Sequence, residues 1–366
     1  MRQTLSVMET IFLYIFIILS TTIFSYLSIG KYSIYEKYKR KIFSFLTILI
    51  PSLFAGIRCG IGTDYNYTYL PEFVKMASSS YKSRLEILYV LLNKIIIRFN
   101  GNLQCVLFVM AFLTLSFMYL GLKQYADKIS FPLAFFTYLI TYYFQSYNIL
   151  RQALSMAIAF FALKYVNERK LMKYFFWIMI AIGFHVGAII MIPMYFLYNC
   201  FTNEKYKYWK KALIILGLLV FINFKNIFSP LILKLSSMQH YYGYVSNIDK
   251  LSFSPYFVFK YVIYLLLPLA FYRKIFNVEK LKLHCAFLVC GCIGMLAAYM
   301  KSIEIARMAF YLHYSIIVVF PATFKKLKGK KSLYVGWLML IGLLGIWIYE
   351  TFIKMNGEIV PYSYLI

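Results

Sequence analysis

Long apolar runs separated by short basic loops form the main pattern of this chain. A run of about 18 or more residues with few charges is long enough to cross a bilayer. Hydrocarbon offers no partner to a free backbone N–H or C=O, so each such run is expected to be a helix. The pattern predicts about twelve membrane spans, at residues 10–29, 42–57, 103–122, 131–147, 149–166, 171–183, 184–199, 211–225, 256–273, 282–300, 305–322 and 332–350.

The basic clusters between these runs predict which loops face the cytoplasm. Lys and Arg are enriched in short cytoplasmic loops, which sets the orientation of the neighbouring spans. Counting spans between the clusters then places both termini outside the cytoplasm. The clusters are Lys31–Lys41, Asn167–Lys173, Glu204–Lys211, Arg273–Lys282 and Lys325–Lys331, with Lys123–Lys128 as a weaker sixth member.

Several apolar runs are shorter than a span normally requires, among them 85–99, 171–183 and 184–199. Segment 85–99 also carries Lys94 and Arg98, and if it crossed the membrane the later basic clusters would face the wrong side. We therefore expect it to be a helix lying in the outer interface. Runs 171–183 and 184–199 are expected either to tilt or to form a broken pair that turns near His185.

Composition supports one transmembrane domain over residues 1–366, because 62% of the chain is hydrophobic and only 14% is charged. The predicted non-cytoplasmic parts are the external segments 58–102 and 226–255 and the C-terminal tail 351–366. In a soluble protein the net charge of +26 would suggest nucleic acid. Here the short loops account for it, so the expected partner is the lipid bilayer and no nucleic acid.

The six cysteines and four histidines form no metal-ligand spacing, so no metal or other cofactor is expected. Unusual polar residues instead gather at the predicted outer ends of the spans. Charged groups at membrane depth are costly and are usually functional or paired. These outer residues are Arg58, Asp64, Arg151, Gln152, His185, Glu304 and Arg307.

Three of these residues are arginines, and a guanidinium binds phosphate oxygens with a planar fork. A diphosphate linked to a lipid would present its oxygens at this depth. The alternative is that Arg151 and Arg307 extend to lipid headgroups, as arginines at helix ends often do. Asp64, in the glycine-bearing turn Gly60–Tyr65, is suited to accept a proton or a hydrogen bond from a sugar hydroxyl. It is equally suited to cap the loop or pair with Arg58.

Two histidine-bearing segments also lie on the predicted outer side. His185 is either a functional residue at the outer turn or a structural histidine with internal partners. His240 and Tyr241 belong to an aromatic external segment. Their rings suit either sugar faces or the interfacial aromatic belt of a membrane protein.

Arg58–Tyr65 resembles the R-x-x-x-G-T-D-Y signature of the EpsG-like, Wzy-type polysaccharide polymerases. Arg151–Leu154 opens a span, Phe184–Ala188 lies at a turn and Ala306–Tyr311 opens a late span, in the order seen in that family. The closing Val360–Tyr362 also resembles its C-terminus. The order and spacing of these motifs carry the resemblance over nearly the whole chain. After His185 the family more often has a small polar residue or Pro, where this chain has valine.

The resemblance implies a bacterial inner-membrane glycosyltransferase that uses no nucleotide sugar and no metal, with a fold similar to the GT-C class. Such enzymes join undecaprenyl-diphosphate-linked repeat units of O-antigen, capsule or exopolysaccharide on the periplasmic or outer face. The lipid-linked oligosaccharide is both donor and acceptor, and a chain-length regulator is a further partner.

Residue roles follow from combining the resemblance with the outer placement. Arg151 and Arg307 are assigned to the diphosphate, and Arg58 either joins them or orients Asp64. Asp64 is the first candidate to activate or orient the acceptor hydroxyl, Glu304 is the second, and His185 serves as a base or as a diphosphate donor group. The expected sugar-binding residues are Tyr65, Gln152, His240 and Tyr241.

Three other functions remain open. A flippase for lipid-linked oligosaccharide needs charged groups along a path through both leaflets, whereas the predicted span interiors are nearly free of charge. A membrane O-acyltransferase would use a histidine but has less need of three outer arginines. An O-antigen ligase uses the same donor with a different acceptor, and the sequence separates it poorly from a polymerase.

Overall fold

The computed structural model describes residues 2–29, 34–78, 81, 83–202, 255–270, 279–301, 303–327 and 330–365. The predicted span 211–225, the basic cluster Glu204–Lys211 and nearly all of the external segment 226–255 lie outside these residues.

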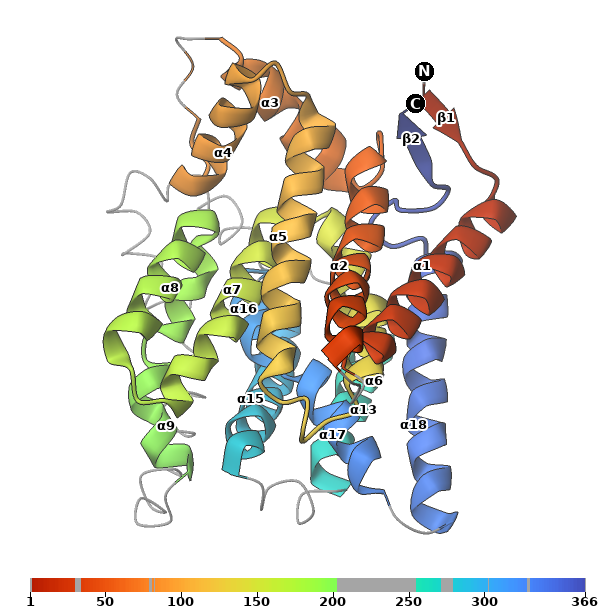
Figure 1. Ribbon diagram of the computed structural model, residues 1–366, viewed down its shortest axis with the longest axis vertical. Coiled ribbons are helices and arrows are strands. Elements are labelled where there is room, and N and C mark those ends of the chain that lie inside the picture. The colour runs from red at the N-terminus through yellow and green to blue at the C-terminus, as the bar shows by residue number, and fades with distance from the viewer. Residues whose placement is uncertain are drawn as a thin grey trace.

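The described residues form an almost entirely helical protein (Figure 1). The helices of its N-terminal half are α1 (Val7–Ser28), α2 (Ile34–Ile57), the π-helix η1 (Tyr65–Tyr69), α3 (Leu70–Met76), α4 (Ile87–Arg98), α5 (Leu103–Lys123), α6 (Phe131–Tyr138), the π-helix η2 (Leu139–Tyr143), the 3₁₀ helix η3 (Gln145–Tyr147), α7 (Leu150–Asn167) and α8 (Leu171–Phe184). They are followed by the 3₁₀ helix η4 (Val186–Met191), α9 (Met194–Thr202), α13 (Pro255–Ala270), α15 (Glu279–Lys301), α16 (Ile303–His313), α17 (Ile316–Lys326), α18 (Lys330–Ile348) and the π-helix η8 (Tyr349–Ile353). Two short strands, β1 (Arg2–Thr4) and β2 (Ser363–Leu365), lie at the chain ends.

Five of the described helical segments are long and apolar enough to cross a membrane, and shorter apolar helices accompany them. The predicted class, a polytopic α-helical membrane protein, is confirmed; the count of about twelve spans and the GT-C-like arrangement stay predictions. The five segments are Val7–Ser28, Lys37–Ile57, Leu103–Lys123, Ala306–Lys326 and Leu333–Ile353.

Side-chain caps fix where two of these helices begin. The Ser6 hydroxyl accepts from Glu9 N at 3.2 Å, and the Glu9 carboxylate accepts from Ser6 N at 2.7 Å, which makes a capping box for α1. Asn102 caps α5 through a bond from Cys105 N at 3.2 Å. Both caps satisfy N–H groups that a helix start leaves without intrahelical partners.

Glycines let neighbouring helices approach closely. A Cβ at Gly121 of α5 would lie 2.6 Å from Phe160 Cε1 of α7. A Cβ at Gly291 of α15 would lie 2.6 Å from the backbone Cα of His313, at the end of α16. Small residues at such crossings are typical of membrane helix pairs, whose association depends on close packing.

Helix α4 lies within the segment predicted to be interfacial and has two distinct faces. Its exposed apolar residues recur every fourth position, at Ile87 (75% exposed), Leu91 (52%) and Ile95 (45%). Tyr89 and Asn93, on the opposite face, are fully buried. One lipid-compatible face and one packed face suit a helix that contacts the membrane, and its predicted place in the outer interface stays a prediction.

The two ends of the chain pair with each other. Strands β1 and β2 are antiparallel, with Arg2 opposite Leu365 and Thr4 opposite Ser363, and Figure 1 shows the termini side by side. Both termini therefore lie on one side of the molecule. That this side is non-cytoplasmic stays a prediction.

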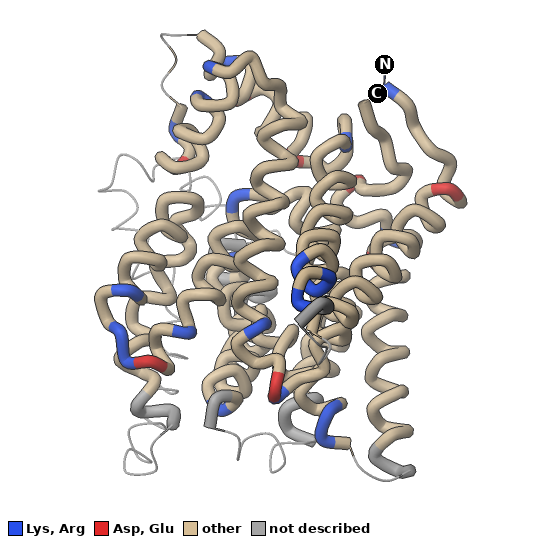
Figure 2. The backbone as a smooth tube through the Cα atoms, in the orientation of Figure 1, with Lys and Arg blue, Asp and Glu red and all other residues tan. Residues whose placement is uncertain are grey.

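Basic residues mark the lower ends of α7, α8 and α17 in Figure 2, at the opposite end of the molecule from the paired termini. Parts of the clusters Asn167–Lys173 and Lys325–Lys331 lie there. Figure 2 also shows basic residues around α3 and α4 at the opposite end, so the orientation of the protein in the membrane stays a prediction.

The close approach of α15 to His313 generates a stability prediction. Gly291→Ala would force a methyl group against backbone that cannot rotate away, so we expect a loss of about 1–3 kcal/mol, seen as a lower melting temperature of the detergent-purified protein. Gly342→Ala in α18 is the control, because nothing lies within 4 Å of its Cβ position. Equal melting temperatures for the two variants would contradict the packing described.

Candidate functional site

The glycine-bearing turn Gly60–Tyr65 adopts a left-handed backbone, which favours glycine, at two positions. Gly60 has φ +66° and Gly62 has φ +92°. A Cβ at Gly60 would lie 2.8 Å from the Arg2 guanidinium, and one at Gly62 would lie 2.8 Å from Asn148 Oδ1. The glycines therefore provide both the left-handed backbone and the room that its neighbours occupy.

The C-terminal tail holds this turn through backbone hydrogen bonds. Cys59 N donates to Ser363 O at 2.8 Å, Gly62 N to Glu358 O at 3.0 Å and Thr63 N to Gly357 O at 3.3 Å. The turn and the tail, far apart in the sequence, thus form one unit. Asp64 is placed by contacts from the last residues of the chain as well as by its own loop.

Asn148, between η3 and α7, joins this unit to the helices. Its Oδ1 accepts from Thr63 Oγ1 at 3.0 Å and from Asp64 N at 3.4 Å, and its Nδ2 donates to Gly357 O at 3.0 Å. Its carbonyl accepts from the Tyr69 hydroxyl. One amide side chain therefore fixes the start of α7 against both the turn and the tail.

Arg58 is part of the frame that supports the turn. Its side chain is fully buried, and its Nη1 and Nη2 donate to Ala55 O at 2.6 Å and Tyr147 O at 3.3 Å. The guanidinium carbon also lies 4.4 Å from the Tyr147 ring centroid. The guanidinium therefore has no exposed surface, and the expected contact of Arg58 with a diphosphate stays a prediction.

Arg151, at the start of α7, lies beside a carboxylate that the sequence did not single out. Its Nη1 forms an ion pair with Glu86 Oε2, and the two side chains are 16% and 12% exposed. Val186 N donates to the other Glu86 oxygen at 3.4 Å. Glu86 thus links the start of α4 to α7 and to the residue that follows His185.

A buried chain of hydroxyl groups aligns α7 with α16. Tyr311 Oη donates to Ser155 Oγ at 2.9 Å, and Ser155 Oγ donates to Ala181 O at 2.7 Å. Arg151 precedes Ser155 by four residues, and Arg307 precedes Tyr311 by four. Because residues four apart share a helix face, the two arginines lie on the faces that these hydroxyls bring together.

Gln152 makes the same connection through the backbone, because its Nε2 donates to Arg307 O at 2.6 Å. Its side chain is only 2% exposed, and its Oε1 is buried without a hydrogen-bond partner. The amide therefore faces Arg307, and its expected contact with sugar stays a prediction.

His185 ends α8 in an extended conformation and caps η4. Its Nδ1 accepts from Gly187 N at 3.1 Å and lies 3.2 Å from Tyr311 Oη, whose proton is directed to Ser155. An Nδ1 that accepts an N–H bond carries no proton, so the neutral ring carries its proton on Nε2. The expected break in the helix pair near His185 is present.

Asp64 lies within electrostatic reach of both arginines. Burial raises the pKa of its carboxyl above the ordinary value, and the positive charges of Arg307 and Arg151 oppose that shift. The Tyr69 hydroxyl also opposes the rise in the pKa of Asp64. Asp64, Glu86, Arg151, His185 and Arg307 are called the arginine group below.

The remaining predicted residues lie elsewhere or outside the description. Tyr65 is buried, and its hydroxyl accepts from Gln104 Nε2 at 3.0 Å and lies 3.7 Å from Cys59 Sγ. The side chain of Glu304 lies outside the described residues, as do His240 and Tyr241. Among the described residues, no group of three or more His, Cys, Asp or Glu is placed to hold a metal ion.

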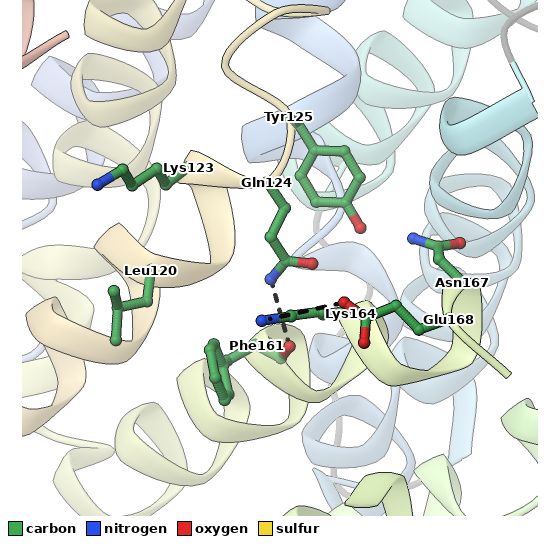
Figure 3. Close-up of a pocket in the computed structure, with 8 residues that line it drawn as sticks. All are labelled: Leu120, Lys123, Gln124, Tyr125, Phe161, Lys164, Asn167 and Glu168. Atoms are coloured by element: carbon green, nitrogen blue, oxygen red, sulfur yellow. Dashed lines mark hydrogen bonds and ion pairs between the residues drawn. The ribbon is translucent and has the colours of Figure 1, made fainter. Parts of the chain in front are cut away.

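A cavity of about 490 Å³ lies at the other end of α7 from Arg151 (Figure 3). Within it, Lys164 lies 3.9 Å from Glu168, and Gln124 Nε2 donates to Phe161 O at 3.3 Å. It is therefore separate from the arginine group. Its lining residues are Leu120, Lys123, Gln124, Tyr125, Phe161, Lys164, Asn167 and Glu168.

Sequence reasoning missed Glu86, Asn148 and Tyr311. Glu86 precedes an apolar helix and belongs to no motif that was recognised. Asn148 lies between two predicted spans, where an asparagine is an ordinary loop residue. Tyr311 closes the motif Ala306–Tyr311, but nothing in the sequence marks its hydroxyl as the partner of Ser155.

The chain belongs to the EpsG family, whose family model matches residues 41–364. Searches of curated proteins and of solved structures returned no match. Family membership and the membrane-helical fold together support a membrane protein of the polysaccharide polymerase type.

The position of Asn148 predicts energetic coupling to Thr63. Asn148→Ala and Thr63→Val each remove their shared hydrogen bond, at a cost of about 1 kcal/mol. Because the double variant loses this bond only once, its melting temperature should fall by less than the sum of the two single decreases. Thr114→Val on α5 is the control, because Thr114 bonds only Met110 O within its own helix. Its shift should add to that of Asn148→Ala. Simple additivity with Thr63→Val would contradict the role given to Asn148.

Proposed function

We propose that this protein is a polysaccharide polymerase that joins lipid-linked oligosaccharide repeat units on the non-cytoplasmic face of the bacterial inner membrane. The donor is a glycan carried on undecaprenyl diphosphate, and the acceptor is a sugar hydroxyl of a second lipid-linked unit. The observation that carries the proposal is the grouping of Arg151 and Arg307 with Asp64 at one end of the helix bundle, through the bonds of Asp64 N to Asn148 and of Gln152 to Arg307 O.

The reaction requires a place for negative charge and a place for a proton. Bond breakage between the anomeric carbon and the donor oxygen leaves charge on the diphosphate, which guanidinium groups stabilise. The new bond forms between the anomeric carbon and the acceptor oxygen, whose proton must leave. Asp64, whose pKa is raised by burial, is suited to take that proton.

His185 is assigned as a hydrogen-bond donor to the diphosphate. Because its Nδ1 accepts from Gly187 N, the proton of the neutral ring is on Nε2. A ring in this state can donate to a phosphate oxygen without a change of protonation. The tautomer favours this role over that of base, which the sequence left open.

Arg58 is assigned a positioning role in place of direct contact with donor. Its buried guanidinium braces the carbonyls of Ala55 and Tyr147, which flank the turn that bears Asp64. This corresponds to the second of the two roles expected for Arg58, the orientation of Asp64.

The proposed function is tested by deleting the gene in its host and examining surface glycan on a gel. We expect the polymer ladder to disappear while single repeat units remain. Loss of all surface glycan with lipid-linked units retained inside would indicate a flippase instead. Free lipid-linked polymer that fails to reach its final acceptor would indicate a ligase.

Complementation of the deletion strain tests the arginines. Arg151→Ala and Arg307→Ala should each reduce polymer by about a hundredfold or more at unchanged protein level. Each substitution removes a cation that stabilises the negative charge of the leaving diphosphate. Arg98→Ala is the control, since Arg98 is an exposed cation of α4 in the same external segment as Glu86. The site assignment would be refuted if Arg151→Lys, Arg307→Lys and Asp64→Asn all gave normal polymer ladders.

The raised pKa of Asp64 predicts the acid side of the pH–rate profile. Because burial keeps the carboxyl protonated to higher pH than usual, transfer by purified enzyme should rise with pH as Asp64 ionises. Asp64→Asn should remove this rise and lower the rate by about 10²–10⁴-fold, whereas Asp64→Glu should retain the rise. If Asp64→Asn shows the same rise of rate with pH as the wild type, the rise belongs to another group.

A further inference from the structure

Glu86 has a place in the arginine group that the proposed reaction has not yet used. It directly precedes α4, and its backbone is extended at that point. Its carboxylate is paired with Arg151, the cation assigned to the donor. An anionic side chain thus occupies part of the guanidinium that the leaving group is expected to contact.

We propose that Glu86 is the resting counter-ion of Arg151 and that the donor's diphosphate replaces it on the guanidinium when the donor binds. This inference rests on the proposed function. It makes Glu86 a positioning residue, which acts on the donor through Arg151 and forms or breaks no covalent bond.

Carboxylate and phosphate present the same feature to an arginine. Each offers oxygen atoms spaced to accept two parallel N–H bonds from the planar guanidinium. A diphosphate carries more negative charge than one carboxylate, so it competes effectively for the same face. A single arginine therefore serves two anions in turn.

The exposure of the pair allows this exchange. Arg151 and Glu86 are 16% and 12% exposed, so the pair reaches the protein surface while most of each side chain is shielded from water. Arg58 is the contrasting case, because it is fully buried and bonds to carbonyls. A ligand can reach the Arg151 pair but has no exposed surface of Arg58 to meet.

A resting counter-ion also solves an electrostatic problem. A guanidinium shielded from water is costly unless hydrogen-bond acceptors or an opposite charge accompany it. Before the donor arrives Glu86 supplies that charge, and when the donor is bound the diphosphate supplies it. Arg151 consequently stays in one orientation in both states.

Exchange has a structural consequence, because Glu86 touches more than Arg151. Its other oxygen accepts from Val186 N at 3.4 Å, next to His185. Release of Glu86 would loosen the link between the start of α4 and the turn after His185. Donor binding is thereby connected to the external segment that carries α4.

Binding of inorganic diphosphate to the purified full-length protein in lipid nanodiscs, measured by titration calorimetry, separates exchange from a permanent brace. Glu86→Gln keeps the shape and the acceptor for Val186 N but removes the competing charge. If Glu86 is exchanged, this variant should bind diphosphate roughly tenfold tighter than wild type. A permanent brace predicts equal or weaker binding, because Arg151 would lose its orientation.

The matched control is Glu72→Gln in α3. Glu72 belongs to the same external segment but accepts from Tyr81 Oη and Ser83 Oγ, both at 2.7 Å. It should leave diphosphate affinity unchanged. In the background of Arg151→Ala, Glu86→Gln should give no gain, because the competition acts through that guanidinium.

Two failures are distinguishable. If wild type binds diphosphate in an Arg151-dependent way and folded Glu86→Gln binds no tighter, the exchange is wrong and the proposed function stands. If neither protein binds diphosphate, and Arg151→Ala changes nothing, both the exchange and the diphosphate site are wrong. Melting curves of each variant establish that it is folded.

Discussion

Backbone groups at membrane depth must find partners inside the protein, and this constraint governs where the candidate site can lie. Continuous helices satisfy it by themselves, but each interruption frees N–H and C=O groups. Asn148 and His185 occupy two such interruptions. The His185 Nδ1 accepts from Gly187 N at its own break, and the Asn148 Oδ1 accepts from Asp64 N in the turn Gly60–Tyr65. Irregular backbone of this kind is tolerated where the protein itself surrounds it. Residues that can take part in chemistry, such as Asp64 and His185, are consequently found at the helix breaks.

The same constraint accounts for the route of the C-terminal tail. The turn Gly60–Tyr65 cannot bond within a helix, and Glu358 and Gly357 of the tail accept its N–H groups. Pairing of β1 with β2 anchors the tail at the start of the chain. Asp64 is therefore placed by three distant parts of the sequence, and its geometry depends on the whole chain being folded.

Patterns along the chain predicted the helices well, because span length and hydrophobicity follow directly from bilayer thickness. They also predicted that Asp64, Arg151 and Arg307 would lie at one end, since helix direction alternates from loop to loop. The apolar pattern gives the end of a span at which a residue lies, however, and not whether its side chain points inward or outward there. Arg58 was thus grouped with the other arginines although it points into the core. Glu86 was missed for the converse reason, because its partner lies on a different helix and no local pattern marks the pair.

The two carboxylates of the arginine group illustrate how environment separates residues of similar chemistry. Glu86 is ion-paired with Arg151, so its negative charge already has a counterpart. Asp64 is affected by both arginines, but burial outweighs their effect and raises its pKa. Glu86 thus holds the guanidinium of Arg151 in place, while Asp64 is suited to accept a proton. Pairs of acidic groups whose surroundings differ in this way commonly divide electrostatic and proton-transfer roles. On this argument the proton of the acceptor hydroxyl goes to Asp64, and Glu86 acts on the donor side through Arg151.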